Sequence, residues 1–386
     1  MVMADYKEVS FKDITVELSD GLHAAPKFYP NGDYIFVNAK NIVNGRILDV
    51  DPDKKTSYSE YLKYKIDLDE NTVLYSIDGT IGNVAKYRGE KVVLGKGACY
   101  LKLKPEVDTN YIFFYLQSPQ FKAYIRKMST GSTIRHISLK TMRNHKFNLP
   151  DLLIQKKIAN ILSRIQNKID TNQQINENLQ EQAQAIYRHM IIENANASWT
   201  PGVLSDIAII TMGQSPKGES YNEEGIGTVF FQGRAEFGFR FPARRLYTTD
   251  PKRMARANDA LMSVRAPVGD INVAYEDCCI GRGLGAIRSN DGHQSFILYT
   301  MLALHKQFSM FNGEGTVFGS INRDALNSMP VDIPPKEVMD QFEDIVAPMD
   351  TAILNNYDEI CRLQAMRDTL LPQLMSGELD VSELNI

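Results

Sequence analysis

The feature that most constrains the fold is an internal repeat, in which the motifs of residues 1–150 recur in the same order about 190 residues later. Motifs that recur in the same order along the whole chain indicate a duplication. A duplication determines the architecture independently of what any single motif does. The main corresponding pairs are Phe36–Asn41 with Phe230–Ala235, Val73–Ile77 with Ala260–Val264, Leu94–Ala98 with Ile280–Leu284, Gly131–Ile134 with Gly315–Phe318, and Asn148–Pro150 with Asp332–Pro334.

Each copy predicts a globular unit of short strands, turns and a few helices. Strand-like runs such as Tyr34–Val37, Val73–Ile77 and Val229–Phe231 are bounded by Gly, Asn and Asp, which favour turns. We therefore expect an α+β fold with a mixed β-sheet and helices in each unit. The predicted boundaries place the two units at residues 1–150 and 198–335, followed by long helical segments at 151–197 and 336–386.

Both helical segments carry an apolar stripe with a seven-residue period, which is typical of a coiled-coil seam. The first segment has no Pro or Gly from Leu152 to Ile192 and predicts a helix of about 60 Å. The first stripe is Leu162, Ile165, Ile169, Asn172, Asn176, Leu179, Ala183, Ile186 and Met190. A shift of 184 residues gives the second stripe, Val346, Met349, Ile353, Asn356, Ile360, Leu363, Arg367, Leu370 and Leu374.

The shared stripe favours packing of the two helices against each other as an antiparallel coiled coil. The alternative is two amphipathic helices that each pack only on their own domain. Asn172 and Asn356 fall in the same predicted layer, so we assign them the setting of the coiled-coil register. Pro348 predicts a kink or a late start of the second helix, and Pro372 and Gly377 predict its end.

An antiparallel helix pair of this kind predicts two globular units at its opposite ends, related by an approximate two-fold rotation. Two-fold proteins contact DNA half-sites about 34–36 Å apart, or at a multiple of that distance. Because the two copies differ in sequence, the expected DNA target is asymmetric, with two short half-sites and an unread gap.

The distribution of charge and the pattern of cysteines indicate the broad class of protein. Residues 1–150 carry 22 basic and 17 acidic side chains, whereas residues 336–386 carry 3 basic and 11 acidic ones. A mildly basic body with an acidic C-terminal segment fits a DNA reader that also binds protein, with the acidic segment as a protein-docking or solvated face. The four cysteines, Cys99, Cys278, Cys279 and Cys361, form no CxxC or zinc pattern. With no apolar run of about 20 residues, we expect a cytoplasmic protein without a membrane span.

The chain resembles the DNA-specificity subunit of type I restriction-modification systems over its whole length. The resemblance rests on Thr130-Gly-Ser-Thr-Ile-Arg-His-Ile137, Asn148-Leu-Pro150, the helix start Gln155-Lys-Lys-Ile-Ala-Asn-Ile-Leu162, the stretch Asn178–Tyr187, and Leu370-Leu-Pro-Gln-Leu-Met-Ser-Gly-Glu-Leu-Asp-Val381. It implies two target-recognition domains separated by spacer helices that bind two modification (methyltransferase) subunits, with restriction/translocase subunits joining the complex. It also implies that S-adenosylmethionine, ATP and Mg are bound by those partners, and that adenine is the base typically methylated.

The sequence offers no catalytic motif of its own, as a specificity role predicts. It contains no phosphate-binding GxxxxGK[ST] loop and no methyltransferase signature. Gly281–Ala286 formally fits GxGxxA, but the sequence that follows does not open a helix. We assign no catalytic residue and no metal ligand.

Candidate DNA contacts are basic and amide side chains that recur in both copies or lie in Gly-rich turns. Lys40 matches Arg234 and Lys96 matches Arg282, although each could be a solvated surface charge. The full candidate set is Lys40, Asn41, Lys96, Ser132, Thr133, Arg135, His136, Gln232, Arg234, Arg244, Arg245, Arg265, Arg282 and Arg323. Asn41 and Gln232 could read adenine or could equally satisfy backbone groups. The second copy lacks a counterpart of Arg135 in its Gly315–Ile321 loop, which leaves the role of that loop open.

Three other functions compete with DNA recognition at this point. A fused nuclease or methyltransferase would need a catalytic motif. A scaffold that binds protein or RNA is compatible with the acidic C-terminal segment. The specificity subunit of another system with a bipartite target would look the same in sequence and would differ in its partner genes.

Overall fold

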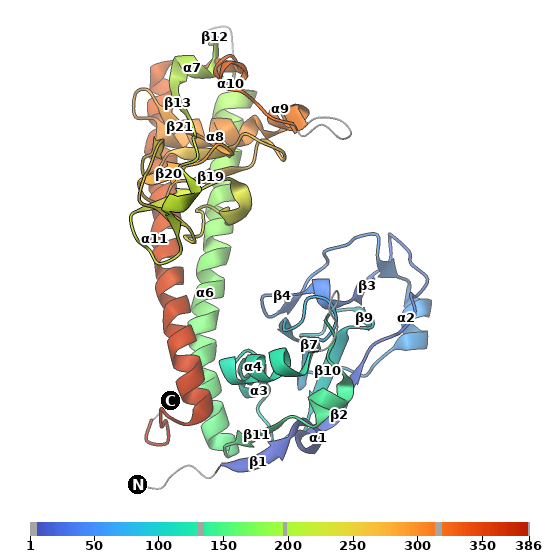
Figure 1. Ribbon diagram of the computed structural model, residues 1–386. Coiled ribbons are helices and arrows are strands. Elements are labelled where there is room, and N and C mark those ends of the chain that lie inside the picture. The colour runs from blue at the N-terminus through green and yellow to red at the C-terminus, as the bar shows by residue number, and fades with distance from the viewer. Residues whose placement is uncertain (1–5, 130–134, 196–198, 313–318, 385–386) are drawn as a thin grey trace. The chain divides into compact units, whose positions relative to one another are not determined.

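The computed structural model describes residues 6–129, 135–195, 199–312 and 319–384. The chain divides into two compact units, Met1–Thr171 with Glu359–Ile386 (unit 1) and Asn172–Asp358 (unit 2). Each unit holds one globular domain, called domain 1 (1–150) and domain 2 (198–335), and one part of each long helix (Figure 1). The predicted boundaries lie beside the ends of the long helices, whereas the compact units divide within them.

Domain 1 is built on a four-stranded antiparallel sheet of order β2-β10-β7-β8. Its strands are β2 (Thr15–Asp20), β10 (Ala98–Leu103), β7 (Thr72–Ser76) and β8 (Val84–Lys86). The smaller sheets use β6 (Lys55–Thr56), β3 (Tyr34–Val37) and β9 (Val92–Leu94), then β1 (Lys7–Ser10) with β11 (Lys146–Leu149), and β4 (Ile42–Val43) with β5 (Arg46–Ile47). Its helices are α1 (Phe11–Ile14), α2 (Tyr58–Tyr64), α3 (Thr109–Tyr115), α4 (Pro119–Met128) and α5 (Leu139–Arg143), with the 3₁₀ turn η1 (Ala39–Asn41).

Domain 2 repeats this plan with a four-stranded sheet of order β13-β21-β18-β19. Its strands are β13 (Ala208–Met212), β21 (Leu284–Ser289), β18 (Ala260–Ser263) and β19 (Ile271–Val273). The second sheet is β14 (Tyr221–Asn222), β16 (Tyr247–Thr248), β15 (Thr228–Phe231), β20 (Cys278–Ile280) and β17 (Met254–Ala255), and β12 (Thr200–Val203) pairs with β22 (Pro330–Ile333). The helices are α7 (Leu204–Ile207), α8 (Gln294–Ala303), α9 (His305–Ser309) and α10 (Arg323–Asn327), with the 3₁₀ turn η4 (Arg234–Glu236).

The topology confirms the predicted duplication and the α+β class. Both four-stranded sheets have the same strand order, and both second sheets contain one parallel pair. The parallel pair is β3 with β9 in domain 1 and β15 with β20 in domain 2, with Phe36 opposite Val93 and Phe230 opposite Cys279. A parallel pair inside otherwise antiparallel sheets is a specific arrangement, so its recurrence extends the repeat from sequence to hydrogen-bonding pattern.

The long helices α6 (Leu152–Tyr187) and α11 (Lys336–Ser376) pack against each other in both units. The Asp151 side chain caps α6 by accepting the Ile154 N–H at 2.9 Å. In unit 1, Arg367 donates to Gln166 at 2.8 Å and Lys168 lies 3.3 Å from Glu359.

The helices run in opposite directions within each unit. In unit 1, Gln166 of α6 contacts Arg367 of α11, and Lys168, which comes later in α6, contacts Glu359, which comes earlier in α11. Ile165, Ile169 and Ile360 share one apolar cluster. In unit 2, the Tyr187 and Phe342 rings lie 5.6 Å apart, centroid to centroid, and Asn356 donates to Asn176 at 2.8 Å. The contacts exclude the alternative in which each long helix packs only on its own domain.

The predicted register pair is wrong in its partner. Asn356 bonds to Asn176, which is 3% exposed and donates in turn to the Ile353 carbonyl at 3.3 Å. Residues matched by a constant shift, such as Asn172 and Asn356, would face each other in a parallel pair. In an antiparallel pair, numbers rise along one helix as they fall along the other, so the neighbour of Asn356 is a later residue than Asn172.

The helix α11 neither starts late at Pro348 nor ends at Pro372, contrary to prediction. The helix begins at Lys336, continues through Pro348 and Pro372, and ends at Ser376. A proline inside a helix leaves the carbonyl four residues earlier without its N–H donor. Asp344 and Asp368, whose carbonyls are freed in this way, are exposed, so water can bond to them. Gly377 has φ +77°, and a Cβ there would lie 2.8 Å from the Tyr6 hydroxyl, so glycine is required where the helix stops.

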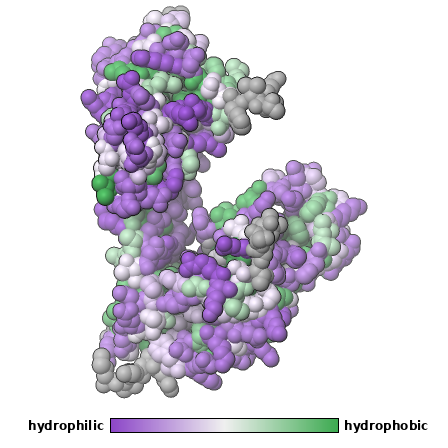
Figure 2. All heavy atoms as spheres, viewed as in Figure 1, coloured by the Kyte–Doolittle hydropathy of each residue, from purple (hydrophilic) through white to green (hydrophobic). Residues whose placement is uncertain are grey.

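Hydrophilic residues cover most of the surface of each unit on the face in Figure 2, with hydrophobic residues in small groups between them. The apolar residues of each domain instead form cores that continue into the long helices. One core includes Phe11 and Tyr111 of domain 1 with Leu162 and Leu374 of the helices. Among the described residues, no helix is both long and apolar enough to cross a membrane.

The Asn176–Asn356 contact generates a first prediction. Asn176→Leu or Asn356→Leu alone should lower the free energy of unfolding by about 1–3 kcal/mol, because the remaining amide loses its partner among apolar neighbours. The double Leu variant should recover most of that loss, since no amide is then left unpaired. Urea denaturation followed by circular dichroism measures this, with exposed Gln173→Leu as control. Purely additive losses would contradict the pairing.

Candidate nucleic-acid interface

Three turns of domain 1 are joined by backbone hydrogen bonds at the end of strand β7. They are Asp78–Gly79, Lys96–Gly97 and Arg135–His136, and we call them the domain 1 turns. The Ile77 N–H donates to the Gly97 carbonyl at 2.9 Å and the Gly79 N–H donates to the Arg135 carbonyl at 3.2 Å. The Ile137 N–H closes the set by donating to the Ile77 carbonyl at 3.0 Å.

The same scaffold recurs in domain 2 at the end of β18. Its turns are Arg265–Ala266, Arg282–Gly283 and Gly319–Ser320, called the domain 2 turns. The Val264 N–H donates to Gly283 at 2.9 Å, the Ala266 N–H to Gly319 at 3.0 Å, and the Ile321 N–H to Val264 at 3.1 Å. Three hydrogen bonds at matched positions show that the duplication includes the turns, and that the backbone in both domains presents side chains from three separate segments together.

The side chains at the matched turn positions differ between the domains. Asp78 corresponds to Arg265, Lys96 to Arg282, and His136 to Ser320. His136 Nδ1 bonds to the Asp78 carboxylate, so this pair is engaged within domain 1. Arg265 and Arg282 are exposed and line a hollow of about 510 Å³, whose other lining residues are Met212, Val264, Ala266, Gly319, Ser320 and Ile321. None of the described residues in this lining is acidic.

Gln232 lies beside the domain 2 turns. It is exposed, and its carbonyl accepts the Gly283 N–H at 3.2 Å. A Cβ at Gly281 would lie 2.8 Å from the Gln232 Cα, and one at Gly283 would lie 2.7 Å from the Gln232 carbonyl oxygen. The two glycines that flank Arg282 are therefore needed for this close approach of two backbones.

Asn41 is corrected as a candidate base reader. It is 2% exposed, its Nδ2 donates to the Leu48 carbonyl at 2.9 Å, and its Oδ1 accepts the Asn38 N–H at 3.0 Å. Both ends of the amide therefore satisfy backbone groups, which was the alternative left open from the sequence. Its neighbour Lys40 is exposed and forms no ion pair within the described part of the chain.

Ion pairs separate the basic candidates into two groups. Arg234 pairs with Asp270, Arg244 with Glu276 at 2.5 Å, and Arg245 with Glu236 at 2.5 Å. The hydrogen bond with Glu236 raises the pKa of Arg245 further. The second group is exposed and has no acidic partner among residues 6–129, 135–195, 199–312 and 319–384: Lys40, Lys96, Arg135, Arg265, Arg282 and Arg323. Ser132 and Thr133, and most of the Gly315–Ile321 loop, lie outside the described residues.

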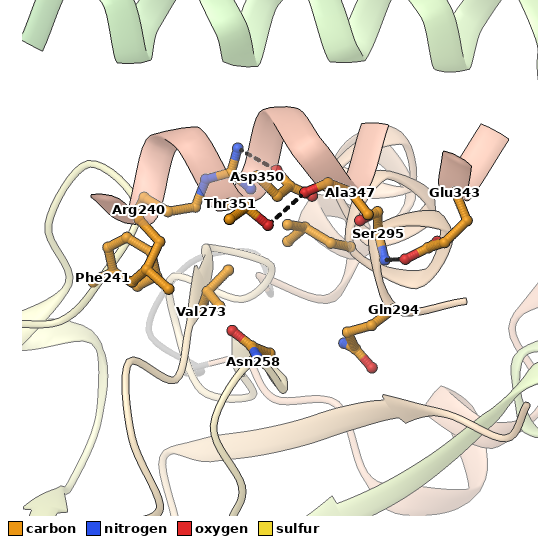
Figure 3. A pocket seen from close by; sticks show the side chains of 12 residues that line it. Arg240, Phe241, Asn258, Val273, Gln294, Ser295, Glu343, Ala347, Asp350 and Thr351 are labelled. Atoms are coloured by element: carbon orange, nitrogen blue, oxygen red, sulfur yellow. Dashed lines mark hydrogen bonds and ion pairs between the residues drawn. The ribbon is translucent and has the colours of Figure 1, made fainter. Parts of the chain in front are cut away.

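Domain 2 is held to its own long helix by acidic residues that the sequence did not single out. Arg240, only 5% exposed, lies 3.3 Å from Asp350 and donates to the Tyr299 hydroxyl at 3.0 Å. Glu343 accepts the N–H groups of Ser295 and Phe296 at 3.0 and 3.1 Å. Figure 3 shows Arg240 and Ser295 reaching from domain 2 to these α11 carboxylates around a cavity of about 210 Å³.

Two further carboxylates of α11 belong to the same contact. His293 lies between Asp291 and Asp340, at 2.8 and 2.7 Å, and the Tyr275 hydroxyl donates to Asp358 at 2.7 Å. The acidic segment was predicted as a protein-docking or solvated face, and part of it instead binds domain 2. A signal was present: a shift of 184 residues aligns Asp340, Glu343 and Asp350 with Lys156, Ala159 and Gln166 of α6, which are not acidic.

Comparison with known proteins identifies the family of this chain. The model of a family described as the type I restriction modification DNA specificity domain matches the chain twice, at residues 3–181 and 196–360. The chain belongs to this family. Each match covers one globular domain and part of a long helix, so this is a specificity subunit with two DNA specificity domains, and the resemblance inferred from sequence is confirmed.

Several proteins are similar to this chain over most of its length. A Methanocaldococcus jannaschii protein named as the specificity subunit of type I restriction enzyme MjaX is 32% identical over 325 residues, covering 78% of this chain and 76% of the relative. The MjaIX specificity subunit of the same organism is 22% identical and covers 98% of this chain and 95% of its own. The crystal structure of the type I restriction-modification S subunit from M. genitalium has the same fold, with a TM-score of 0.63, 18% identity, and coverage of 99% and 98%.

The family match and the names of the relatives identify this chain as the specificity subunit of its system. Among the described residues, no group of three or more His, Cys, Asp and Glu side chains could hold a metal ion. The arrangement offers two three-turn backbone scaffolds that carry exposed cations without an acidic partner among the described residues.

The His293 contact predicts a pH dependence. Burial lowers the pKa of His293, but the hydrogen bonds with Asp340 and Asp291 outweigh it, and the pKa is raised overall. Hydrogen bonds from Lys336 and His293 keep the pKa of Asp340 low, so this carboxylate stays charged at neutral pH. Stability from protonated His293 is therefore fully present below about pH 6.5, the ordinary histidine pKa, and is lost as the pH rises through the raised value.

His293→Gln should therefore lower the melting temperature more at pH 6 than at pH 9. Thermal unfolding of both proteins across this range measures the difference. His305→Gln changes an exposed histidine of the same domain and is the control. A loss that is equal at both pH values would contradict a charged His293 in this contact.

Proposed function

We propose that this specificity subunit reads a split, asymmetric DNA target, one half-site with each domain. The observation that carries the proposal is the three-turn scaffold, which recurs in both domains with the same backbone hydrogen bonds but with different side chains. The same backbone scaffold with different side chains suits two domains that each recognise a different short DNA sequence. The long helices α6 and α11 would set the length of the unread gap between the half-sites.

Phosphate contacts are assigned to the cations that have no acidic partner. Lys96 and Arg282 occupy the same turn position, lie between glycines and are exposed. Lysine and arginine can replace each other where only a positive charge near a phosphate is needed, and not where two-point hydrogen bonding is needed. The exchange of Lys for Arg at this position therefore favours a phosphate contact in both half-sites. The ion-paired Arg234, Arg244 and Arg245 are weaker candidates, because their charge is already compensated.

The partners proposed are two modification (methyltransferase) subunits and the restriction/translocase subunits. The relatives are named as specificity subunits of type I restriction enzymes, which implies such companions. S-adenosylmethionine, ATP and Mg would be bound by those companions. Acidic residues of α11 that domain 2 does not use, such as the exposed Glu337, Asp344 and Asp368, are candidates for binding a modification subunit.

The competing functions are less well supported. A scaffold for protein or RNA would not require two DNA specificity domains, which the family match identifies. The subunit of another system with a bipartite target would be distinguished by the enzymes encoded beside it.

The decisive test is a map of methylated bases. The chain is co-expressed with its neighbouring modification subunit, and methylation is mapped by single-molecule sequencing. The expected result is a split motif with one methyladenine in each half-site. Exchanging residues 1–150 for those of a relative should change one half-site and leave the other intact. An active complex that yields no split motif would contradict the two-reader proposal.

The phosphate assignment is tested by the salt dependence of binding. In the assembled complex, Lys96→Ala or Arg282→Ala should each reduce the slope of log K against log salt concentration by about 1, because one phosphate contact is lost. Arg244→Ala, which removes an ion-paired arginine, should leave the slope unchanged. Fluorescence anisotropy with a duplex that carries the mapped motif measures the slope. Equal slopes for Arg282→Ala and the unmodified complex would exclude the phosphate contact.

A further inference from the structure

We propose that Arg265 determines sequence specificity by reading a guanine in the half-site of domain 2. The inference rests on the proposed function and goes one step further, because it assigns a base to a residue. The position that carries it is the first of the three turns, where the two domains have opposite charges, Asp78 in domain 1 and Arg265 in domain 2.

The backbone at Arg265 is held on both sides. The Val264 N–H bonds to Gly283, the Val264 carbonyl accepts the Ile321 N–H, and the Ala266 N–H bonds to Gly319. Arg265 itself faces Ser320 in an isolated antiparallel bridge. A side chain that contacts a base needs a backbone held in this way, because two-point hydrogen bonding fails when the supporting backbone shifts by about 1 Å.

The guanidinium of Arg265 is free to bind a ligand. The side chain is exposed and has no acidic partner among the described residues, unlike Arg234, Arg244 and Arg245 of the same domain. Among the described residues that line the hollow with Arg265 and Arg282, none is acidic. A negatively charged or acceptor-rich edge can therefore approach Arg265 without displacing an internal ion pair.

The comparison of turn positions separates base reading from phosphate binding. At the second position both domains keep a cation, Lys96 or Arg282, as expected for contact with a backbone that is the same in every sequence. At the first position the charge reverses, as expected for contact with the part of DNA that differs between half-sites. Asp78 only accepts hydrogen bonds when ionised and is bonded to His136, so it cannot contact the acceptors of guanine as Arg265 would.

Guanine is the base that matches an arginine. In the major groove it presents two adjacent acceptors, O6 and N7, and the planar guanidinium presents two parallel N–H donors at the matching spacing. Lysine can also donate to O6 and N7, but its flexible ammonium lacks the fixed planar fork of arginine, so it should select guanine less strongly. Replacing Arg265 with lysine therefore distinguishes a base contact from a phosphate contact.

The experiment compares Arg265→Lys and Arg265→Ala in the complex with the modification subunit, by mapping methylation on a DNA library in which the half-site of domain 2 is randomised. We expect the unmodified complex to require guanine at one position of that half-site. Arg265→Ala should lose about 5- to 140-fold of that preference at this position alone, the range for one two-point base contact, and Arg265→Lys should lose part of it. The half-site of domain 1 should stay the same.

Arg256→Lys and Arg256→Ala are the matched controls. Arg256 is an exposed arginine that precedes β18, whereas Arg265 follows this strand, and it has no ion-pair partner in the described part of the chain. These variants should leave the motif unchanged. Equal melting temperatures of all four variants exclude unfolding as the cause of any change.

Several outcomes would overturn the inference while the proposed function survives. One is a split motif without guanine in the half-site of domain 2. Another is an unchanged motif with Arg265→Lys and uniformly slower methylation with Arg265→Ala, which would make Arg265 a phosphate contact. A third is an unchanged motif and rate in both variants. If the unmodified complex gives no split motif at all, the proposed function fails first and the inference fails with it.

Discussion

The structure depends on the packing of α6 against α11. Neither domain closes its apolar core alone, because the core of domain 1 includes Ile158 and Leu374 and that of domain 2 includes Tyr187 and Phe342 from the long helices. Burial of such side chains contributes about 1.5–3 kcal/mol each. The helices therefore complete the core of each domain. A change in their register would also displace the domain 1 turns and the domain 2 turns, which are built on these cores.

Within that constraint, the two domains show which features a duplicated reader keeps and which it changes. The sheet order, the parallel strand pair and the hydrogen bonds that join the three turns are the same. The side chains displayed on the turns differ, as do the contacts with the long helix. Domain 2 binds α11 through the carboxylates of Glu343 and Asp350, whereas the aligned positions on α6 are Ala159 and Gln166. The strand order and the backbone hydrogen bonds of the turns have been retained. The side chains on the turns and those that contact the long helix have diverged.

Prediction from sequence succeeded where a pattern is local or repeated. The duplication and the strands around Val73 and Ala260 both follow from such patterns. It failed where the outcome depends on a partner distant in sequence. The partner of Asn356 depends on helix direction, and the buried state of Asn41 depends on the Leu48 carbonyl that it binds. The continuation of α11 through Pro348 depends on which face of the helix is exposed.

The sequence by itself determined the family, the two-domain plan, the pair of long helices and the three segments that carry the turns, because these are encoded in collinear motifs and in the period of apolar residues. Only the tertiary structure decided which arginines are ion-paired. Arg234, Arg244, Arg245, Arg265 and Arg282 are the same residue type in similar polar surroundings, and nothing local to them distinguishes the paired from the free. The carboxylates that neutralise the first three are brought to them by the folded chain, since an ion pair depends on distance in space and not on distance in sequence.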